Sequence, residues 1–187
     1  MGFDAKTKGR KKLSTQKGFR RRQDIGEFFH PRSIAIAGVS NESMNAATLA
    51  FLEPLLEFGF EGKIFPLNLK GGEVSGLKIY PSLLDIPESV DHVLVSIPAP
   101  LTPQLMEECV IKKVKSVIFF TSGFSELGIE ERRRLEAKLV EIASRGNSRI
   151  LGPNCWGVYC PEAKLSYCSD FPKESGNVSF IAQSGGN

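Results

Sequence analysis

The sequence predicts a Rossmann-like, doubly wound α/β fold around a parallel sheet. From residue 33 onward, short runs of β-branched and apolar residues alternate with longer amphipathic stretches, which is the pattern of βαβ units. Glycine, proline or small polar residues follow the apolar runs. Parallel strands with right-handed crossovers bind ligands outside their carboxyl ends, so we expect functional residues directly after the strands.

The first predicted strand covers residues 33–39 and is apolar on both faces, as a central parallel strand should be. A helix is expected over residues 45–58, because Gly59 suits a left-handed cap at its carboxyl end. The later elements are predicted as a second strand over 63–67 with Pro66 near its end, a turn-rich crossing over 68–87, a third strand over 92–97, a helix over 104–113 with Pro103 in its first turn, a fourth strand over 116–120, a helix over 129–145 ended by Gly146, a fifth strand over 149–151, an irregular stretch to 173, and a further strand over 177–182.

The composition is that of a globular protein, with 41% hydrophobic and 24% charged residues. A chain of 187 residues suits one domain with a full core and a short extra piece at either end. No apolar run approaches the roughly 18 residues that span a membrane, and the amino terminus lacks a secretory signal. We therefore expect a cytoplasmic protein without a membrane partner.

The charge is unevenly distributed. Residues 1–22 hold nine Lys or Arg and one acid, Asp4, whereas the remaining 15 basic and 20 acidic residues give −5. We expect residues 1–24 to form a solvated, disordered leader. Phosphate contacts with nucleic acid are the alternative, which no aromatic platform or recognition helix supports.

Cysteine and histidine usage predicts neither a metal site nor a catalytic triad. The four cysteines show no paired spacing, and only His30 and His92 could complete a ligand set. Neither histidine lies near a plausible nucleophile in the sequence. We expect reduced thiols at Cys109, Cys155, Cys160 and Cys168.

The loops after the first two strands suggest a phosphorylated nucleotide ligand. Gly38 supplies only the first glycine of a dinucleotide fingerprint, yet a tight turn into a helix still offers backbone N–H groups to a phosphate. A purely structural turn is the alternative. After the second strand, Lys70 stands where NAD-binding proteins usually carry an acid, which favours a ribose phosphate as in coenzyme A or NADP. Lys70 could equally be a surface lysine.

The loops after the other strands complete a ligand-binding edge. Residues 97–100 form a rigid apolar ledge suited to an adenine or a pantetheine chain. Residues 121–126 offer hydroxyl groups and a flexible glycine, and residues 152–157 offer an amide and a thiol.

These motifs together resemble a known family. The segments "KIFPLNLK", "YPSLLDIP", "IPAP", "TSGFSELG", "LGPNCWGV" and "VSFIAQSGG" occur in the order found in the nucleoside-diphosphate-forming (ADP-forming) acyl-CoA synthetases, which are related to the alpha subunit of succinyl-CoA synthetase. The similarity runs from about Phe28 to Asn187. It departs from the family at residues 45–47, Asn-Ala-Ala, where relatives often have a glycine before the first helix, and at Leu69, where they often have proline.

The resemblance implies a site of coenzyme A-binding residues, with no catalytic residue and no metal ligand in this chain. It places Cys155 near the reacting thiol without making it the nucleophile. Ser184 and Gly185 match the loop that binds the phosphate of a catalytic phosphohistidine. The implied coenzyme A contacts are Gly38, Val39, Ser40, Asn41, Lys70, Ile97, Pro98, Ala99, Ser122, Gly123, Asn154 and Cys155.

The resemblance also implies a domain order and a reaction. Residues 25–175 would form the coenzyme A-binding domain, and residues 176–187 would begin a flavodoxin-like second domain. The family converts an acid, coenzyme A and ATP into acyl-CoA, ADP and phosphate; ATP, ADP and Mg²⁺ are implied only for the missing histidine-bearing and ATP-grasp domains or a beta subunit. Homo-oligomerisation is left open. The alternatives are a non-catalytic module that senses coenzyme A or a nucleotide, and an NADP-dependent oxidoreductase domain.

Overall fold

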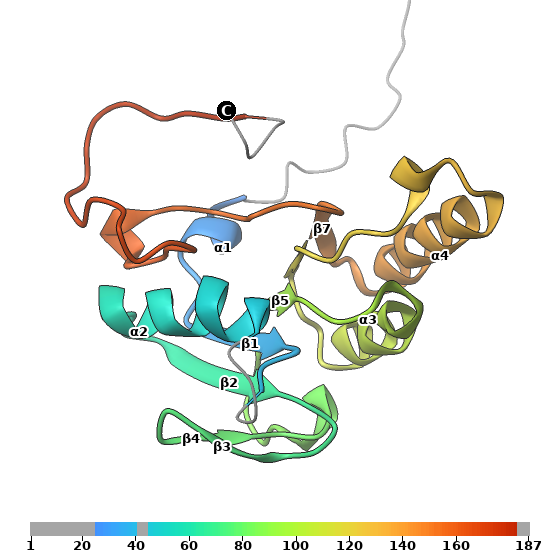
Figure 1. The fold of residues 1–187 in the computed structure, drawn as a ribbon, viewed down its shortest axis with the longest axis horizontal. Helices are drawn as coiled ribbons and strands as arrows, with labels where there is room; N and C mark the ends of the chain where they lie inside the picture. Colours follow the sequence, from blue (N-terminus) through green and yellow to red (C-terminus); the bar gives the residue numbers. More distant parts are fainter. Residues whose placement is uncertain (1–24, 41–44, 183–187) are drawn as a thin grey trace, which may run out of the picture.

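A five-stranded parallel sheet forms the centre of the computed structural model, which describes residues 25–40 and 45–182 (Figure 1). The strands follow the order β2-β1-β5-β6-β7, so the sheet is doubly wound with its switch in strand order between β1 and β5. This confirms the predicted fold class and all five central strands. Their bounds are β1 (Ser33–Ala37), β2 (Lys63–Leu67), β5 (His92–Val95), β6 (Ser116–Phe119) and β7 (Arg149–Leu151).

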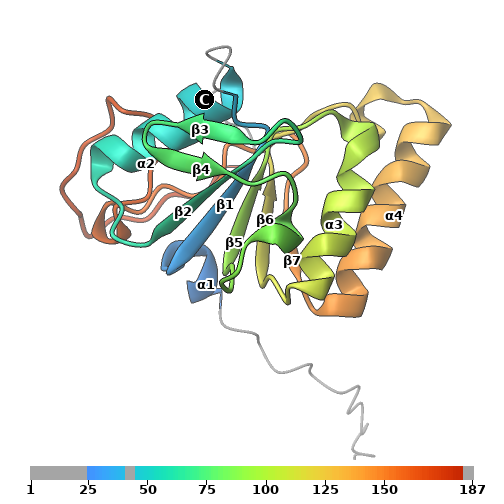
Figure 2. The same cartoon turned by 90° about the horizontal axis from the view of Figure 1, so that it is seen from below.

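Helices cover both faces of the sheet because alternate side chains of each strand point to opposite sides. Ala35 and Ala37 of β1 belong to a core with helices α3 (Thr102–Ile111) and α4 (Glu130–Gly146). Ile34 and Ile36 belong to a second core with the helix formed by η1 (Thr48–Leu52) and α2 (Glu53–Phe58). Figure 2 shows α3 and α4 together on one side of the sheet and α2 on the other.

An extended segment completes the second face, as the irregular stretch after residue 151 predicts. Leu165 is buried in the core beside α2. Trp156 packs against Phe120 with ring centroids 5.0 Å apart, and Tyr167 packs against Trp156 at 5.7 Å. The extended segment runs along this face of the sheet (Figure 1), and its aromatic rings pack it beside the end of β6.

Several elements differ from those predicted. The crossing after β2 contains a hairpin of β3 (Gly72–Val74) and β4 (Leu77–Ile79), whose turn holds Ser75 and Gly76 at positive φ. Asn147, rather than Gly146, ends α4 in the left-handed conformation. The turn η2 (Leu83–Asp85) lies in the predicted turn-rich crossing. Other short helical turns were not predicted: α1 (Gly26–Phe29), η3 (Ala99–Leu101), η4 (Ser125–Leu127) and η5 (Pro161–Ala163).

The prediction of a strand over residues 177–182 is wrong, because the structure shows no strand there. A strand needs a neighbour for its backbone hydrogen bonds, and Val178, Phe180 and Ile181 are 82–97% exposed. The second domain predicted to begin at residue 176 therefore stays a prediction. The basic leader predicted over residues 1–24 lies outside the described residues.

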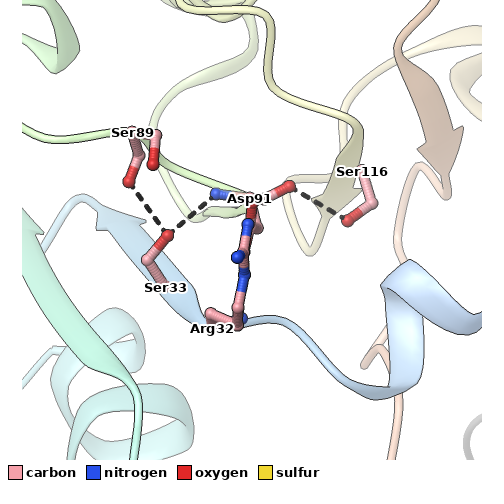
Figure 3. A network of polar contacts seen from close by, with 5 residues as sticks. All are labelled: Arg32, Ser33, Ser89, Asp91 and Ser116. Atoms are coloured by element: carbon pink, nitrogen blue, oxygen red, sulfur yellow. Dashed lines mark hydrogen bonds and ion pairs between the residues drawn. The ribbon is translucent and has the colours of Figure 1, made fainter.

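Polar side chains join the amino ends of β1 and β5 in a network (Figure 3). The Ser33 hydroxyl accepts a hydrogen bond from the Asp91 N–H and donates one to the Ser89 carbonyl, each at 3.0 Å. The Asp91 carboxylate accepts hydrogen bonds from the backbone N–H and the Nε–H of Arg32, at 3.0 and 3.3 Å. These bonds fix the entry into both strands.

His92 is buried beside this network. Its Nδ1 lies 2.6 Å from the Ser116 hydroxyl, and its ring stands edge-on to Phe28. Burial lowers the pKa of His92 to about 4, although the neighbouring Asp91 charge acts in the opposite direction. The imidazole is therefore neutral near pH 7.

Candidate functional site

A cleft of about 350 Å³ opens at the switch in strand order. The residues at the carboxyl ends of β1, β2 and β5 form one part of its lining, and residues 81–83 form another. Helix α3 contributes Gln104, Leu105 and Glu108, and Leu101 of the preceding turn η3 extends this face. This is the position at which open α/β sheets bind their ligands.

The turn after β1 requires glycine. Gly38 has φ +104°, and a Cβ there would lie 2.3 Å from the Ser96 carbonyl oxygen after β5. Hydrogen bonds hold the turn on both sides: the Gly38 N–H donates to the Leu67 carbonyl at 3.0 Å, and the Ser96 N–H donates to the Ala37 carbonyl at 2.9 Å. The backbone of this turn therefore lines the cleft without a side chain in the way.

Asn45 and Thr48 secure the same turn from the following helix. The Asn45 amide donates to the Gly38 carbonyl at 2.7 Å, and its Oδ1 accepts from the Thr48 N–H at 3.0 Å, as an N-cap residue does. The Thr48 hydroxyl lies 3.4 Å from the Ser40 N–H. Asn45, in the segment 45–47 that departs from the family pattern, thus caps the helix and positions the turn.

Asn68 connects the turn after β1 to the segment after β2. Its amide donates to the Val39 carbonyl at 2.7 Å, and its Oδ1 accepts from the Lys70 N–H at 3.0 Å. Asn68 and Leu69 line the cleft, whereas the exposed Lys70 lies beside it. The two segments therefore form one continuous rim.

The ledge after β5 forms the neighbouring wall. Ile97 and Pro98 line the cleft, and Ala99 is buried behind them. The Thr121 hydroxyl donates to the Ile97 carbonyl at 2.8 Å, and the Thr102 hydroxyl donates to the Ala99 carbonyl at 2.7 Å. These bonds fix the ledge between β5 and β6.

The loops after β6 and β7 lie together beyond this ledge. The Asn154 N–H donates to the Thr121 carbonyl at 3.1 Å, and the Cys155 N–H donates to the Phe119 carbonyl at 3.0 Å. A Cβ on Gly123 would lie 3.8 Å from the Ala99 side chain, so this second group adjoins the ledge.

An exposed carboxylate, that of Glu126, fixes the loop after β6. Glu126 accepts hydrogen bonds from the N–H groups of Gly123 and Phe124, at 2.5 and 3.0 Å. Burial alone would raise the pKa of Glu126, but these backbone bonds lower it overall. The ionised Glu126 carboxylate therefore holds its own loop in place through these two hydrogen bonds.

Comparison with known proteins identifies the family. Residues 32–161 match the CoA binding domain family. The chain belongs to this family. It is 42% identical, over 84% of its length, to the alpha subunit of the ADP-forming acetate–CoA ligase I of Pyrococcus furiosus. It is 35% identical, over 83% of its length, to the ADP-forming 4-hydroxybutyrate–CoA ligase of Nitrosopumilus maritimus.

A solved structure shares the fold of this CoA-binding domain. The dinucleotide-forming acetyl-coenzyme A synthetase 1 of Candidatus Korarchaeum cryptofilum, solved with phosphate and ADP, superposes with a TM-score of 0.78 at 38% identity and covers 87% of the chain. The chain spans 34% of that protein, and 35% and 22% of the two ligases above. It thus corresponds to about a third or less of each relative.

The predicted site residues fall into two adjoining groups in this CoA-binding domain. Gly38, Ile97 and Pro98 line the cleft. Val39, Ser40, Lys70 and Ala99 adjoin its lining, and the second group consists of Ser122, Gly123, Asn154 and Cys155 after β6 and β7. Three predicted residues lie outside the described part of the chain: Asn41, Ser184 and Gly185.

Sequence reasoning missed the residues that come from α3 and from the turn before η2. Ser82, Gln104 and Glu108 line the cleft, but none of them follows a central strand. The segment "YPSLLDIP" signalled the turn as part of the family pattern. Glu108 gave no signal of its own, because a carboxylate on an amphipathic helix is ordinarily solvent-facing.

The described residues contain no cluster of three potential metal ligands, and the four cysteines are free. Burial strongly raises the pKa of the Cys109 thiol, which is therefore protonated. No helix in the described part of the chain is long and apolar enough to cross a membrane.

Proposed function

We propose that this chain binds coenzyme A in the cleft, as the CoA-binding part of an ADP-forming acyl-CoA synthetase. The observation that carries the proposal is the cleft at the switch in strand order, bounded by Gly38, Asn68 and Ile97, in a chain of the CoA binding domain family. The names of the two ligases support the synthetase assignment.

Each part of the rim has a chemical role in this proposal. The backbone of residues 38–41 and the Lys70 ammonium group bind phosphate groups. Ile97, Pro98 and Ala99 pack along the cofactor. Ser122 and Gly123 flank the pantetheine arm, which leads to Asn154 and Cys155.

The contribution of this domain to the reaction is positional. Contacts made far from the thiol hold the cofactor, so that the thiol meets the acyl group at a high effective concentration. ATP, Mg²⁺ and the phosphohistidine belong, in this proposal, to further domains or to a beta subunit. We also propose that residues 176–187 begin a second domain, in which Ser184 and Gly185 bind phosphate. The cytoplasmic location and the oligomeric state stay predictions.

We expect the chain alone to bind coenzyme A without turnover. Its two histidines are His30 and His92. His92 lies buried at the amino end of the sheet, away from the cleft, and His30 directly follows α1. Neither histidine is therefore placed to carry a phosphoryl group at the rim.

Titration calorimetry of the whole chain tests the proposal. We expect coenzyme A to bind and NADP not to compete with it. Lys70→Ala should weaken coenzyme A binding about tenfold, by the loss of one charge-assisted contact, and should affect dephospho-coenzyme A less if Lys70 meets the 3′-phosphate. Lys138→Ala, which removes an exposed lysine of α4, is the matched control. Absence of coenzyme A binding, or binding of NADP instead, would contradict the proposal.

A further inference from the structure

One charged side chain lies in an otherwise neutral cleft. Among the described residues that line it, Glu108 alone carries a charge, while most of the others are apolar. Glu108 follows Gln104 by four residues on the same face of α3, which places it about 6 Å farther along the helix from the ledge after β5. The half-buried carboxylate therefore marks the end of the cleft farthest from the ledge, which we call its deep end.

The Glu108 carboxylate is anchored through one oxygen. Its Oε2 accepts hydrogen bonds from the Ser82 hydroxyl at 2.8 Å and from the Leu83 N–H at 2.9 Å. The other oxygen of Glu108, Oε1, has no hydrogen-bond partner among the described residues. An ionised carboxylate can only accept hydrogen bonds, so a ligand group bound there must be a donor.

We propose that Glu108 selects the adenine ring of bound coenzyme A, through a hydrogen bond from the exocyclic amine to Oε1. This inference rests on the proposed function. Leu83 and Leu105 supply apolar walls for a flat ring, whereas a phosphate group beside the carboxylate would be repelled. The base then lies at the deep end, and the phosphates lie near the Gly38 turn and Lys70.

The carboxylate discriminates between purines by their donor pattern. Hypoxanthine carries an oxygen acceptor in place of the adenine amine, and this oxygen would face the Glu108 acceptor. A site built around a donor rejects an analogue that lacks it, because its own polar group is left unpaired. The chain should therefore bind coenzyme A at least ten times more tightly than deamino-coenzyme A, whose base is hypoxanthine.

The experiment compares these two cofactors by calorimetry on the whole chain and on two variants. Glu108→Gln keeps a carbonyl oxygen for Ser82 and Leu83 and turns an amide donor toward the base. We expect the affinity ratio to fall to about one or to invert in this variant. Glu107→Gln is the matched control, because Glu107 pairs with Arg145 of α4 at 2.5 Å instead of lining the cleft; it should keep the parental ratio.

Equal affinities of the parent chain for the two cofactors would overturn the inference, as would an unchanged ratio in Glu108→Gln. The parental ratio needs no variant, so it decides the question even if Glu108→Gln does not fold. Coenzyme A binding with a ratio of one would overturn this inference alone. No binding of either cofactor would overturn the proposed function as well.

Discussion

At the amino end of the sheet, polar side chains bind one another and the backbone, whereas at the carboxyl end they hold loops around a cleft. The Ser33 and Asp91 side chains close the amino end (Figure 3). The Asn45 and Asn68 amides bind the carbonyl groups of Gly38 and Val39, and the cleft remains between the loops. Short polar side chains thus bond to the backbone within the amino end of the sheet, whereas at the carboxyl end they hold the loops that surround the cleft. The comparison predicts that substitutions at the amino end change stability without changing the cleft.

The largest expected effect lies at the carboxyl end, where Gly38→Ala should perturb both stability and binding. The new Cβ would lie 2.3 Å from the Ser96 carbonyl oxygen, at a φ of +104°. Backbone strain of this kind costs about 1–3 kcal/mol, and displacement of the neighbouring carbonyl adds to it, so we expect a loss of about 3 kcal/mol or more. Urea unfolding measures the loss, and coenzyme A titration should show that the cleft no longer binds.

Gly76→Ala is the control, because it places a side chain at a positive φ without a close contact to another atom. Gly76 has φ +76° in the β3–β4 turn, and a Cβ there meets nothing within 4 Å. We expect this variant to lose about 1 kcal/mol and to keep its coenzyme A affinity. Equal losses in the two glycine variants would show that the close approach to Ser96 does not matter.

The next effect lies at the amino end, where His92 should make stability depend on pH. The pKa of His92 is about 4 in the folded chain, against 6.5 for the unperturbed group. Between these values the unfolded chain binds more protons, so the free energy of unfolding falls as the pH falls. The contribution of His92 should decrease by about 2 kcal/mol from pH 7 to pH 5. Urea unfolding at both pH values measures it.

His92→Asn should flatten this dependence, because the amide does not titrate and can still reach the Ser116 hydroxyl. The variant should be less stable at pH 7, since a smaller side chain leaves a gap beside Phe28. His30→Asn, at an exposed position, is the control and should keep the parental dependence. A parental pH dependence in His92→Asn would assign the effect to other groups.

The centre of the sheet could be predicted from the sequence because β1, β5 and β6 are buried on both faces and form continuous apolar runs. The less buried strands β2 and β7 were predicted from short apolar runs between turn residues, and Gly38 explains why β1 ends at Ala37, since its positive φ turns the chain. The β3–β4 hairpin could not be found in this way, because its strands, Gly72–Val74 and Leu77–Ile79, carry a glycine and charged residues and form no apolar run. Gly146 was expected to end α4, but Asn147 also tolerates the left-handed conformation and takes that position.

The site was predictable where its residues follow strands and not where they come from a helix face. Gly38, Ile97 and Pro98 line the cleft as the topology predicts. The pattern of α3 distinguishes buried from exposed positions, but it does not show that the face carrying Gln104 and Glu108 borders a cleft. The bonds from Ser82 and Leu83 to Glu108 join segments 25 or more residues apart, and only the fold brings these together.

The smallest expected effect tests whether the stability of the amino end comes from the hydrogen bonds of Asp91 or from an exposed ion pair at the surface. The Asp91 side chain is 15% exposed and accepts two hydrogen bonds from Arg32. The nearby Glu88 pairs with Lys63 through side chains that are 44% and 61% exposed. Asp91→Asn should cost about 1 kcal/mol, whereas Glu88→Gln should cost less than about 0.5 kcal/mol, because exposed ion pairs contribute little.

Urea unfolding of the two variants at low and high salt separates these contributions. Salt screens the exposed pair, so the small cost of Glu88→Gln should vanish at high salt while most of the cost of Asp91→Asn remains. Asp91→Asn should also lower the pKa of His92 further, because the Asp91 charge raises it in the parent. Coenzyme A affinity should be unchanged in both variants, since neither residue lines the cleft. A larger cost for Glu88→Gln than for Asp91→Asn would mean that surface charge, rather than the bonds of Asp91, holds this end of the sheet together.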